Sequence, residues 1–154
     1  MSIMIGPALH HAHLIPELKT RKRESVLGEL TRLAGESGFV REPDVLRCTL
    51  ALRERLGSTA VGRGVAIPNA RSLLVTRWMV IVARSRRGVA WDEAGEEAVH
   101  LVLLVLSPAG TRAAVHLERV ARIAAAVRPA RARQKLLECA SAEEAGAVLA
   151  EALA

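Results

Sequence analysis

The chain has 154 residues, of which 51% are hydrophobic, and this suffices for one domain with a buried core. No apolar run approaches the roughly 20 residues that cross a bilayer, and residues 1–18 lack the pattern of a secretory signal, so a cytoplasmic protein is predicted. The net charge of +6 comes almost wholly from arginines spread along the chain, and with one Phe and no Tyr there is little for base stacking, so nucleic-acid binding is the weakest function considered.

Two amphipathic helices are predicted in the first part of the chain. One begins at Thr20 and stops at Gly35 or Gly38, and its apolar stripe consists of Val26, Leu27, Leu30 and Leu33. The second has Pro43 at its first position and ends at Gly57, and its apolar residues at helical spacing are Val45, Cys48, Leu52 and Leu56.

Two central strands follow. Residues 76–85 and 98–108 are short, β-branched and apolar on both faces, a pattern typical of strands covered by helices on both sides. Residues 86–97, which lie between them, predict a further short strand that is ended by turns.

The last third of the chain predicts three helices. The first starts at Thr111 and ends before Pro129, and its stripe consists of Ala113, Leu117, Val120, Ala124 and Val127. The second runs to about Cys139, and the third opens with Ser141 and Glu144 in a capping-box arrangement. No linker or repeat divides the chain, so the prediction is one α/β domain over residues 1–154, with residues 1–12 as a flexible extension.

The cysteines and the clustered histidines predict no metal site or cofactor. Cys48 and Cys139 lie in predicted helices without a CxxC spacing, so both are expected to be buried thiols. His10, His11 and His13 lie close together, but no Cys or carboxylate nearby completes a ligand set, which favours a chance cluster.

The segment "STAVGRGVAIPNARS", residues 58–72, is the most informative stretch. A hydroxyl pair and two glycines lead into a short apolar strand that ends at Pro68-Asn69, as in a turn that presents one side chain to a partner. His116 lies near a helix start, where the helix dipole favours neutral imidazole and backbone N–H groups favour an anion. His100 lies in an apolar strand and is expected to be a core or edge residue.

These residues carry a family resemblance. "LRERLGSTAVGRGVAIPNARS" resembles the signature of enzyme IIA domains of the fructose/mannitol-type bacterial phosphotransferase system, including the nitrogen-regulatory branch. "ELKTRKRESVLGELTRLA" is similar to the first helix of that family, "GVAWDEAGEEAVHLVLLVLSPAG" to its central strands, and "HLERVARIAAAV" and "LLECASAEEAGAVL" to its last helices. The resemblance therefore extends over nearly the whole chain.

The resemblance implies a mixed β-sheet flanked by helices on both faces. It also implies a site, because the family carries phosphate on a histidine, taken from a histidine-containing phosphocarrier protein and passed on in sugar transport to a IIB domain. Asn69 holds the place of that histidine here. By the same resemblance the second active-site histidine matches His116, the signature arginine matches Arg53, and Ser58 and Thr59 keep the hydroxyl-bearing segment.

Asparagine at this position changes the chemistry. A neutral imidazole offers a nitrogen lone pair to phosphorus, whereas the amide nitrogen of Asn69 has its lone pair delocalised into the carbonyl and is no useful nucleophile. The sequence therefore predicts a pseudo-IIA regulatory protein, not an enzyme, that binds a protein partner, either the histidine-containing phosphocarrier protein or a regulatory target. We expect Asn69 to lie within reach of His116, with Arg53 supplying charge and Ser58 or Thr59 a hydroxyl, in a pocket that can hold an anion.

Three alternatives stay open at this point. His116 could accept phosphate and make the chain an unconventional phosphocarrier. The fold could be drifting without a distinct function. The arginine-rich surface could bind nucleic acid, which is the weakest of the three.

Overall fold

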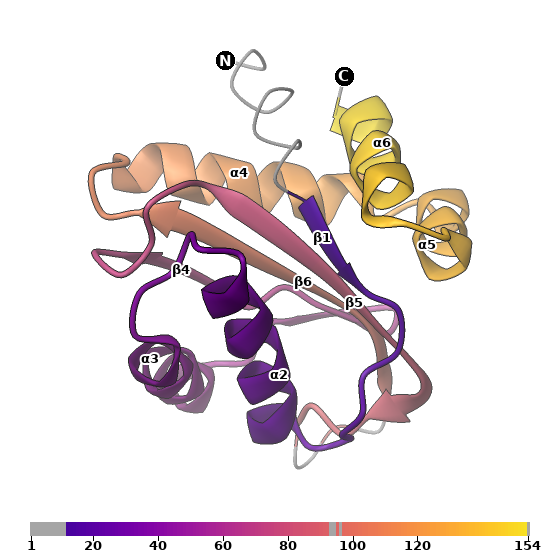
Figure 1. Ribbon diagram of the computed structural model, residues 1–154. Helices are drawn as coiled ribbons and strands as arrows, with labels where there is room; N and C mark the ends of the chain where they lie inside the picture. Colours follow the sequence, from indigo (N-terminus) through magenta and orange to yellow (C-terminus); the bar gives the residue numbers. More distant parts are fainter. Residues whose placement is uncertain (1–11, 93–94, 96, 154) are drawn as a thin grey trace.

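A mixed β-sheet between two helical layers organises the chain (Figure 1). The computed structural model describes residues 12–92, 95 and 97–153, and within these it contains six strands and five helices. The layer on one face consists of α2 (Arg23–Glu36) and α3 (Pro43–Leu56). The layer on the other face consists of α4 (Ala113–Ala126), α5 (Ala130–Glu138) and α6 (Ala142–Leu153). The predicted α/β class with helices on both faces is confirmed.

Strand β6 (Val99–Pro108) lies inside the sheet and pairs on both of its edges. On one edge it runs antiparallel to β5 (Met79–Val89), which in turn pairs in parallel with β1 (Ala12–Ile15). On the other edge it runs parallel to β3 (Val65–Ala66) and to β4 (Asn69–Ser72), and β3 pairs with the antiparallel β2 (Ala60–Gly62).

Strands β3 and β4 form one interrupted line along β6. Val65 pairs with Leu101 and Asn69 pairs with Val105, so both strands keep the same register. Pro68 lies at the interruption, where it has no N–H to donate, and its carbonyl accepts the Val105 N–H at 3.0 Å. Asn69 is therefore the first residue of β4, and its pairing with Val105 fixes its position along β6.

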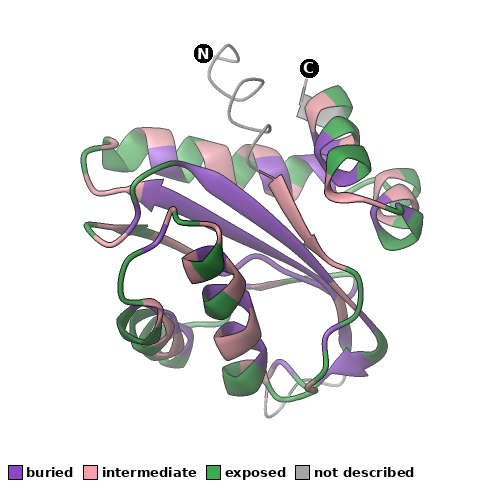
Figure 2. Ribbon diagram, viewed as in Figure 1, coloured by how far each residue is buried: buried purple, intermediate pink, exposed green. Residues whose placement is uncertain are grey.

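The two faces of β6 form the centres of two apolar clusters. Leu101, Leu103 and Val105 face the α4–α6 layer, and Val102, Leu104 and Leu106 face the α2–α3 layer. All six are buried, so β6 appears almost entirely purple in Figure 2. The prediction of central strands covered on both faces is confirmed.

Helix α2 also matches its prediction. Val26, Leu27 and Leu30 are fully buried against the sheet. The helix continues through Gly35 and ends before Gly38, whose φ of +84° is unfavourable for residues with a Cβ. Of Gly35 and Gly38, the two expected ends of this helix, Gly38 is therefore the one that ends it.

Helix α3 forms where predicted, but the stripe that predicted it faces solvent. Val45, Leu52 and Leu56 are 51%, 59% and 89% exposed, whereas the buried residues of α3 are Leu46, Leu50 and Glu54. Periodicity identifies an apolar stripe but does not say which side of the helix packs on the sheet. Cys48 shares the outward stripe and is exposed, so the prediction of a buried thiol is wrong for Cys48 and confirmed for Cys139.

In helix α4 the predicted apolar stripe also differs from the buried face, though by less than in α3. Its buried residues are His116, Ile123 and Ala126, while Leu117, predicted in the apolar stripe, is 63% exposed. His116 therefore lies on the packed face of α4. Burial of this polar ring is possible because partners on the sheet beneath α4 satisfy its two nitrogens, as described below.

Two boundaries differ from the sequence prediction. Strand β1 was not predicted, and Ala12, expected in the flexible extension, is its first residue, while residues 1–11 lie outside the described part. Strand β5 continues to Val89, so the first residues of the segment 86–97, which was expected to form a separate short strand, belong to β5.

The cap predicted for α6 is confirmed, because Ser141 Oγ accepts the Glu144 N–H at 3.1 Å. Among the described residues, no helix has both the length and the apolar character needed to cross a bilayer.

The close approach of α2 to α3 predicts opposite effects for two glycines of α2. A Cβ at Gly35 would lie 2.4 Å from Pro43 Cγ, so Gly35→Ala should destabilise the fold by about 1–3 kcal/mol. At Gly28 the nearest atom would be Arg47 Cδ at 3.4 Å, so Gly28→Ala should be neutral or stabilise by up to about 1 kcal/mol through helix propensity. Urea unfolding measures both, and equal effects would contradict the close approach.

Candidate functional site

Asn69 and His116 meet at the end of β6. Asn69 opens β4, and His116 lies near the start of α4, on the layer that covers this face of the sheet. Asn69 Oδ1 lies 3.0 Å from His116 Nε2, and Ser107 Oγ lies 2.8 Å from His116 Nδ1. His116 is only 6% exposed and Ser107 is fully buried. The structure therefore brings Asn69 and His116 into direct contact, as the sequence predicted.

The amide of Asn69 fixes the tautomer of His116. Asn69 Nδ2 donates a hydrogen bond to the Ile67 carbonyl at 3.0 Å, so the amide must turn Oδ1 toward His116. An amide oxygen only accepts, so His116 Nε2 must carry the hydrogen and donate it. Nδ1 then holds the lone pair and accepts the Ser107 hydroxyl hydrogen.

The surroundings of His116 keep the ring neutral. Burial lowers its pKa from 6.5, and the positive charges of Arg119 and Arg71 lower the pKa further. Arg119 donates to Ser107 Oγ at 3.1 Å, so this hydroxyl accepts from Arg119 while it donates to His116. The guanidinium of Arg119 also lies 4.2 Å from the centre of the Trp78 ring, which fixes it over the sheet.

Two arginines give the site a positive field. Arg71 donates to the carbonyls of Ala109 and Thr111, at 3.2 and 3.0 Å, and so ties β4 to the loop before α4. Within the described residues, neither Arg71 nor Arg119 has a carboxylate in an ion pair, and Arg119 Nε is buried without a hydrogen-bond partner. A neutral histidine beside two uncompensated guanidinium groups favours an anionic ligand.

No hydrogen bond or ion pair joins Arg53, Ser58 or Thr59 to the Asn69–His116 pair. Arg53 donates to the Gly57 carbonyl at 2.7 Å, and Ser58 Oγ accepts the Ala60 N–H at 3.1 Å. The charges that act on His116 are those of Arg119 and Arg71, so the positive charge expected from Arg53 comes from other residues.

Thr59 belongs to a separate buried cluster around Glu54. The carboxylate of Glu54 accepts the Thr59 hydroxyl and also the Thr59 N–H, the latter at 3.0 Å. It lies 3.3 Å from Trp91 Nε1, which donates to it. The Thr59 carbonyl accepts the Ile67 N–H at 3.0 Å. This cluster anchors both ends of the segment that leads to Asn69 and offers no free hydroxyl to the site.

The remaining histidines lie elsewhere. His100 is half-buried on β6, and its Nδ1 lies 2.8 Å from the Ser85 carbonyl. His13 lies in β1 and forms a T-shaped ring contact with Phe39, while His10 and His11 lie outside the described residues. In the part of the chain that the structure describes, no three His, Cys, Asp or Glu side chains are grouped as a metal site would require.

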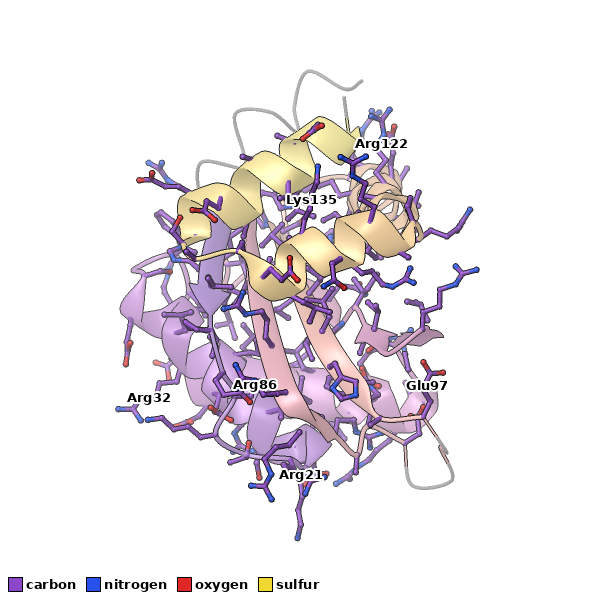
Figure 3. The ribbon with its side chains drawn as sticks, turned by 90° about the vertical axis from the view of Figure 1, so that its right-hand side faces the viewer. Arg21, Arg32, Arg86, Glu97, Arg122 and Lys135 are labelled. Atoms are coloured by element: carbon purple, nitrogen blue, oxygen red, sulfur yellow. The ribbon has the colours of Figure 1, made fainter. Side chains whose placement is uncertain are left out.

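Basic side chains are dispersed over the surface. Figure 3 shows Arg122 and Lys135 on the α4–α6 layer, with Arg86 and Arg32 far below them on other elements. Arg122 pairs with Glu118 at 3.2 Å, and Arg32 pairs with Glu36 at 3.3 Å. In this view the charges form no continuous stripe of the kind that tracks a nucleic-acid backbone.

The sequence matches a known family over most of its length. The family model described as "Phosphoenolpyruvate-dependent sugar phosphotransferase system, EIIA 2" matches residues 8–152. The chain belongs to this EIIA 2 family. A nitrogen regulatory protein of Bradyrhizobium diazoefficiens is 35% identical over 137 residues, which cover 89% of this chain and 88% of the relative.

Solved structures show that this IIA protein also shares the family's fold. The nitrogen regulatory protein IIA-Ntr of Neisseria meningitidis matches with a TM-score of 0.80 and 28% identity, covering 95% of this chain and 99% of that chain. The mannitol IIA of Escherichia coli matches with a TM-score of 0.73 and 18% identity, over 89% and 95% of the two chains, and shows the fold alone.

Sequence reasoning missed two members of the site in this IIA protein. Ser107 lies in an apolar strand, and Arg119 lies in a helix rich in alanine and arginine, so neither stands out from its neighbours. One signal was available, since Ser107 lies at the carboxyl end of its strand, and ligands of open α/β sheets bind at that end. The contact of Arg119 with Ser107 depends on how α4 packs and has no sequence signature.

The tautomer of His116 is directly measurable. In ¹⁵N NMR of the wild-type chain at pH 7, we expect a protonated Nε2 signal and an unprotonated Nδ1 signal. The neutral pattern should persist below pH 6.5, because the folded-state pKa is lowered. The folded chain then binds fewer protons at His116 than the unfolded chain, so this contribution to stability is complete above 6.5 and is lost as the pH falls.

A doubly protonated ring at pH 7, or hydrogen on Nδ1 instead of Nε2, would contradict the assigned amide orientation. The His116→Gln variant identifies the His116 signals by their loss.

Proposed function

We propose that this IIA protein is a cytoplasmic regulatory module that binds a protein partner and carries no phosphate on residue 69. The family match supports the fold and the resemblance of the signature supports Asn69 as the residue at the phosphoacceptor position. The observation that carries the proposal is the hydrogen-bonded Asn69 amide, which donates to Ile67 and accepts from His116. The NH₂ group of the amide thus acts as a hydrogen-bond donor, and its oxygen acts as a hydrogen-bond acceptor.

The amide lacks the chemistry that phosphoryl transfer needs. Transfer to a side chain requires a lone pair on the attacking atom, and the amide nitrogen has none to offer. Positioning and charge neutralisation are the other contributions of protein to phosphoryl transfer, and Arg71 and Arg119 supply charge beside the site. A site with charge and no nucleophile supports binding without covalent turnover.

The tautomer of His116 argues against the alternative phosphocarrier. The ring presents Nε2–H to Asn69, and its lone pair on Nδ1 points at the buried hydroxyl of Ser107. Attack through Nε2 would require the hydrogen to move to Nδ1 and would set the Nε2 lone pair against Asn69 Oδ1. Turning the amide to avoid this would bring Oδ1 against the Ile67 carbonyl. The hydrogen-bond network therefore favours a His116 that does not transfer phosphate.

The charges indicate the chemistry of the partner group. Arg71 and Arg119 favour a carboxylate or a phosphoryl group that remains attached to the partner. The names of relatives point to protein partners as well. The Bradyrhizobium relative is named a nitrogen regulatory protein, and a solved structure contains the mannitol IIA of Escherichia coli in complex with phosphorylated IIB. A regulatory role through protein binding agrees with both.

The central experiment tests phosphate transfer. The chain is incubated with the phosphocarrier proteins of its own organism and phosphoenolpyruvate, and its intact mass is measured under conditions that preserve acid-labile phosphate. We expect no gain of a phosphoryl group, because neither Asn69 nor His116 offers a lone pair to the donor. Phosphate on His116, located by its absence in His116→Gln, would overturn the proposal and favour the alternative carrier.

A second variant tests whether only the nucleophile is absent. Asn69→His should gain phosphate in the same assay, since the Pro68 turn remains and the new imidazole would stand beside His116 and the charges of Arg71 and Arg119. We expect partial phosphorylation, because Arg71 lies exposed beside the site and can hinder the donor. Asn69→Gln is the matched control and should stay unmodified. A folded Asn69→His that takes up no phosphate would show that more than the nucleophile differs.

A further inference from the structure

The outward side of α3 carries an apolar stripe. Val45, Leu52 and Leu56 are all more than half exposed, and the exposed Cys48 lies in line with them. Their spacing of three, four and seven residues sets them along one side of the helix, opposite the buried Leu46 and Leu50. Grouped exposed apolar side chains of this kind mark an interaction surface, whereas scattered ones do not.

No described element of the chain covers this stripe. Helix α3 packs against α2 and the sheet with its inner side, and it lies at the corner of its layer in Figure 1. Its outward side is green in Figure 2. The stripe is therefore open to a second molecule.

The charges beside the stripe have a definite order. Successive residues of a helix are about 100° apart, so Asp44 and Arg55 lie on one side of the stripe, and Arg53 lies on the other. All three residues are exposed. The side with Asp44 and Arg55 is thus acidic near the start of α3 and basic near its end.

We propose that α3 is the interface of a symmetric homodimer in which the α3 helices of two copies pack antiparallel. A two-fold axis brings each side of the stripe against the same side of the other copy, with its direction reversed. Asp44 then faces the partner's Arg55. Parallel packing would instead set Arg55 beside the partner's Arg53, so the charge order selects the antiparallel arrangement.

The same axis gives the register of the stripe. The midpoint between Asp44 and Arg55 lies between Thr49 and Leu50, and the midpoint between Val45 and Leu52 lies between Cys48 and Thr49, so the axis passes near Thr49. Val45 then packs against the partner's Leu52, and Cys48 lies close to the partner's Cys48. The Val45–Leu52 contacts and the Asp44–Arg55 ion pairs are satisfied by one register.

Contacts within one copy leave the arginines available. Arg55 lies 3.5 Å from Glu24 at the surface, and Arg53 donates one N–H to Gly57. Each guanidinium has five N–H donors, so further donors remain for a partner. Helix α3 has 14 residues, about 21 Å of length, so one helix pair gives a small interface and a dimer that depends on concentration.

Sedimentation of the full chain over a range of concentrations tests the proposal. We expect a monomer–dimer equilibrium, and Leu52→Glu should raise its dissociation constant about a hundredfold, since each dimer loses two buried leucines and gains two buried charges. Leu117→Glu is the matched control, because Leu117 is 63% exposed and lies on α4, across the sheet. It should dimerise like the wild type.

Two further variants test the orientation. Asp44→Arg should weaken the dimer, and the double variant Asp44→Arg with Arg55→Asp should restore it, since the swap re-forms the same pairs. Mild oxidation should give a covalent dimer that Cys48→Ser abolishes, because Cys139 is buried.

The failing outcomes are distinct. A wild-type chain that stays monomeric at all concentrations, or a dimer that survives Leu52→Glu, would overturn the interface. A dimer that the charge swap does not restore, or that does not cross-link at Cys48, would overturn the antiparallel arrangement. None of these results bears on phosphate transfer at Asn69 or His116.

Discussion

Strand β6 is the constraint on which the remaining structure depends. It is buried on both faces and paired on both edges, so every neighbour must fit its register. Pairing with Val105 fixes the position of Asn69 along β6. The side chain of Ser107, two residues further, points to the same face of the sheet as that of Val105. One strand therefore sets the positions from which β4 and α4 bring their side chains together.

The site is a chain of hydrogen bonds in which each orientation determines the next. The Ile67 carbonyl sets the amide of Asn69, the amide sets the tautomer of His116, and the tautomer sets the direction of the Ser107 hydroxyl. Arg119 forms the last hydrogen bond of this series by donating to Ser107. Buried networks that are satisfied in this way hold one geometry, because any reversal leaves a buried group unpaired.

The sequence predicted the elements better than their faces. Local patterns sufficed for α2, for β6 and for the cap of α6, because caps and continuous apolar runs act within a few residues. The outward stripe of α3 and the burial of His116 in α4 were not predicted, since the side of a helix that packs depends on the layer beneath it. The resemblance brought Asn69 and His116 together, but it expected positive charge from Arg53 and a hydroxyl from Ser58 or Thr59, whereas Arg119 and Ser107 supply them beside His116. These contacts join residues of separate elements and depend on packing alone.

The turn before residue 69 is held mainly by contacts that do not involve the Asn69 side chain, to which the Asn69 amide adds one hydrogen bond at the Ile67 carbonyl. Glu54 anchors Thr59, the Thr59 carbonyl holds the Ile67 N–H, and the Pro68 carbonyl holds β6. The codons for asparagine and histidine differ in a single base, so an amide and an imidazole at this position are neighbours in mutation. Because the backbone anchors do not involve the amide, a single-base change can exchange the two groups while the backbone that presents them keeps its place on β6.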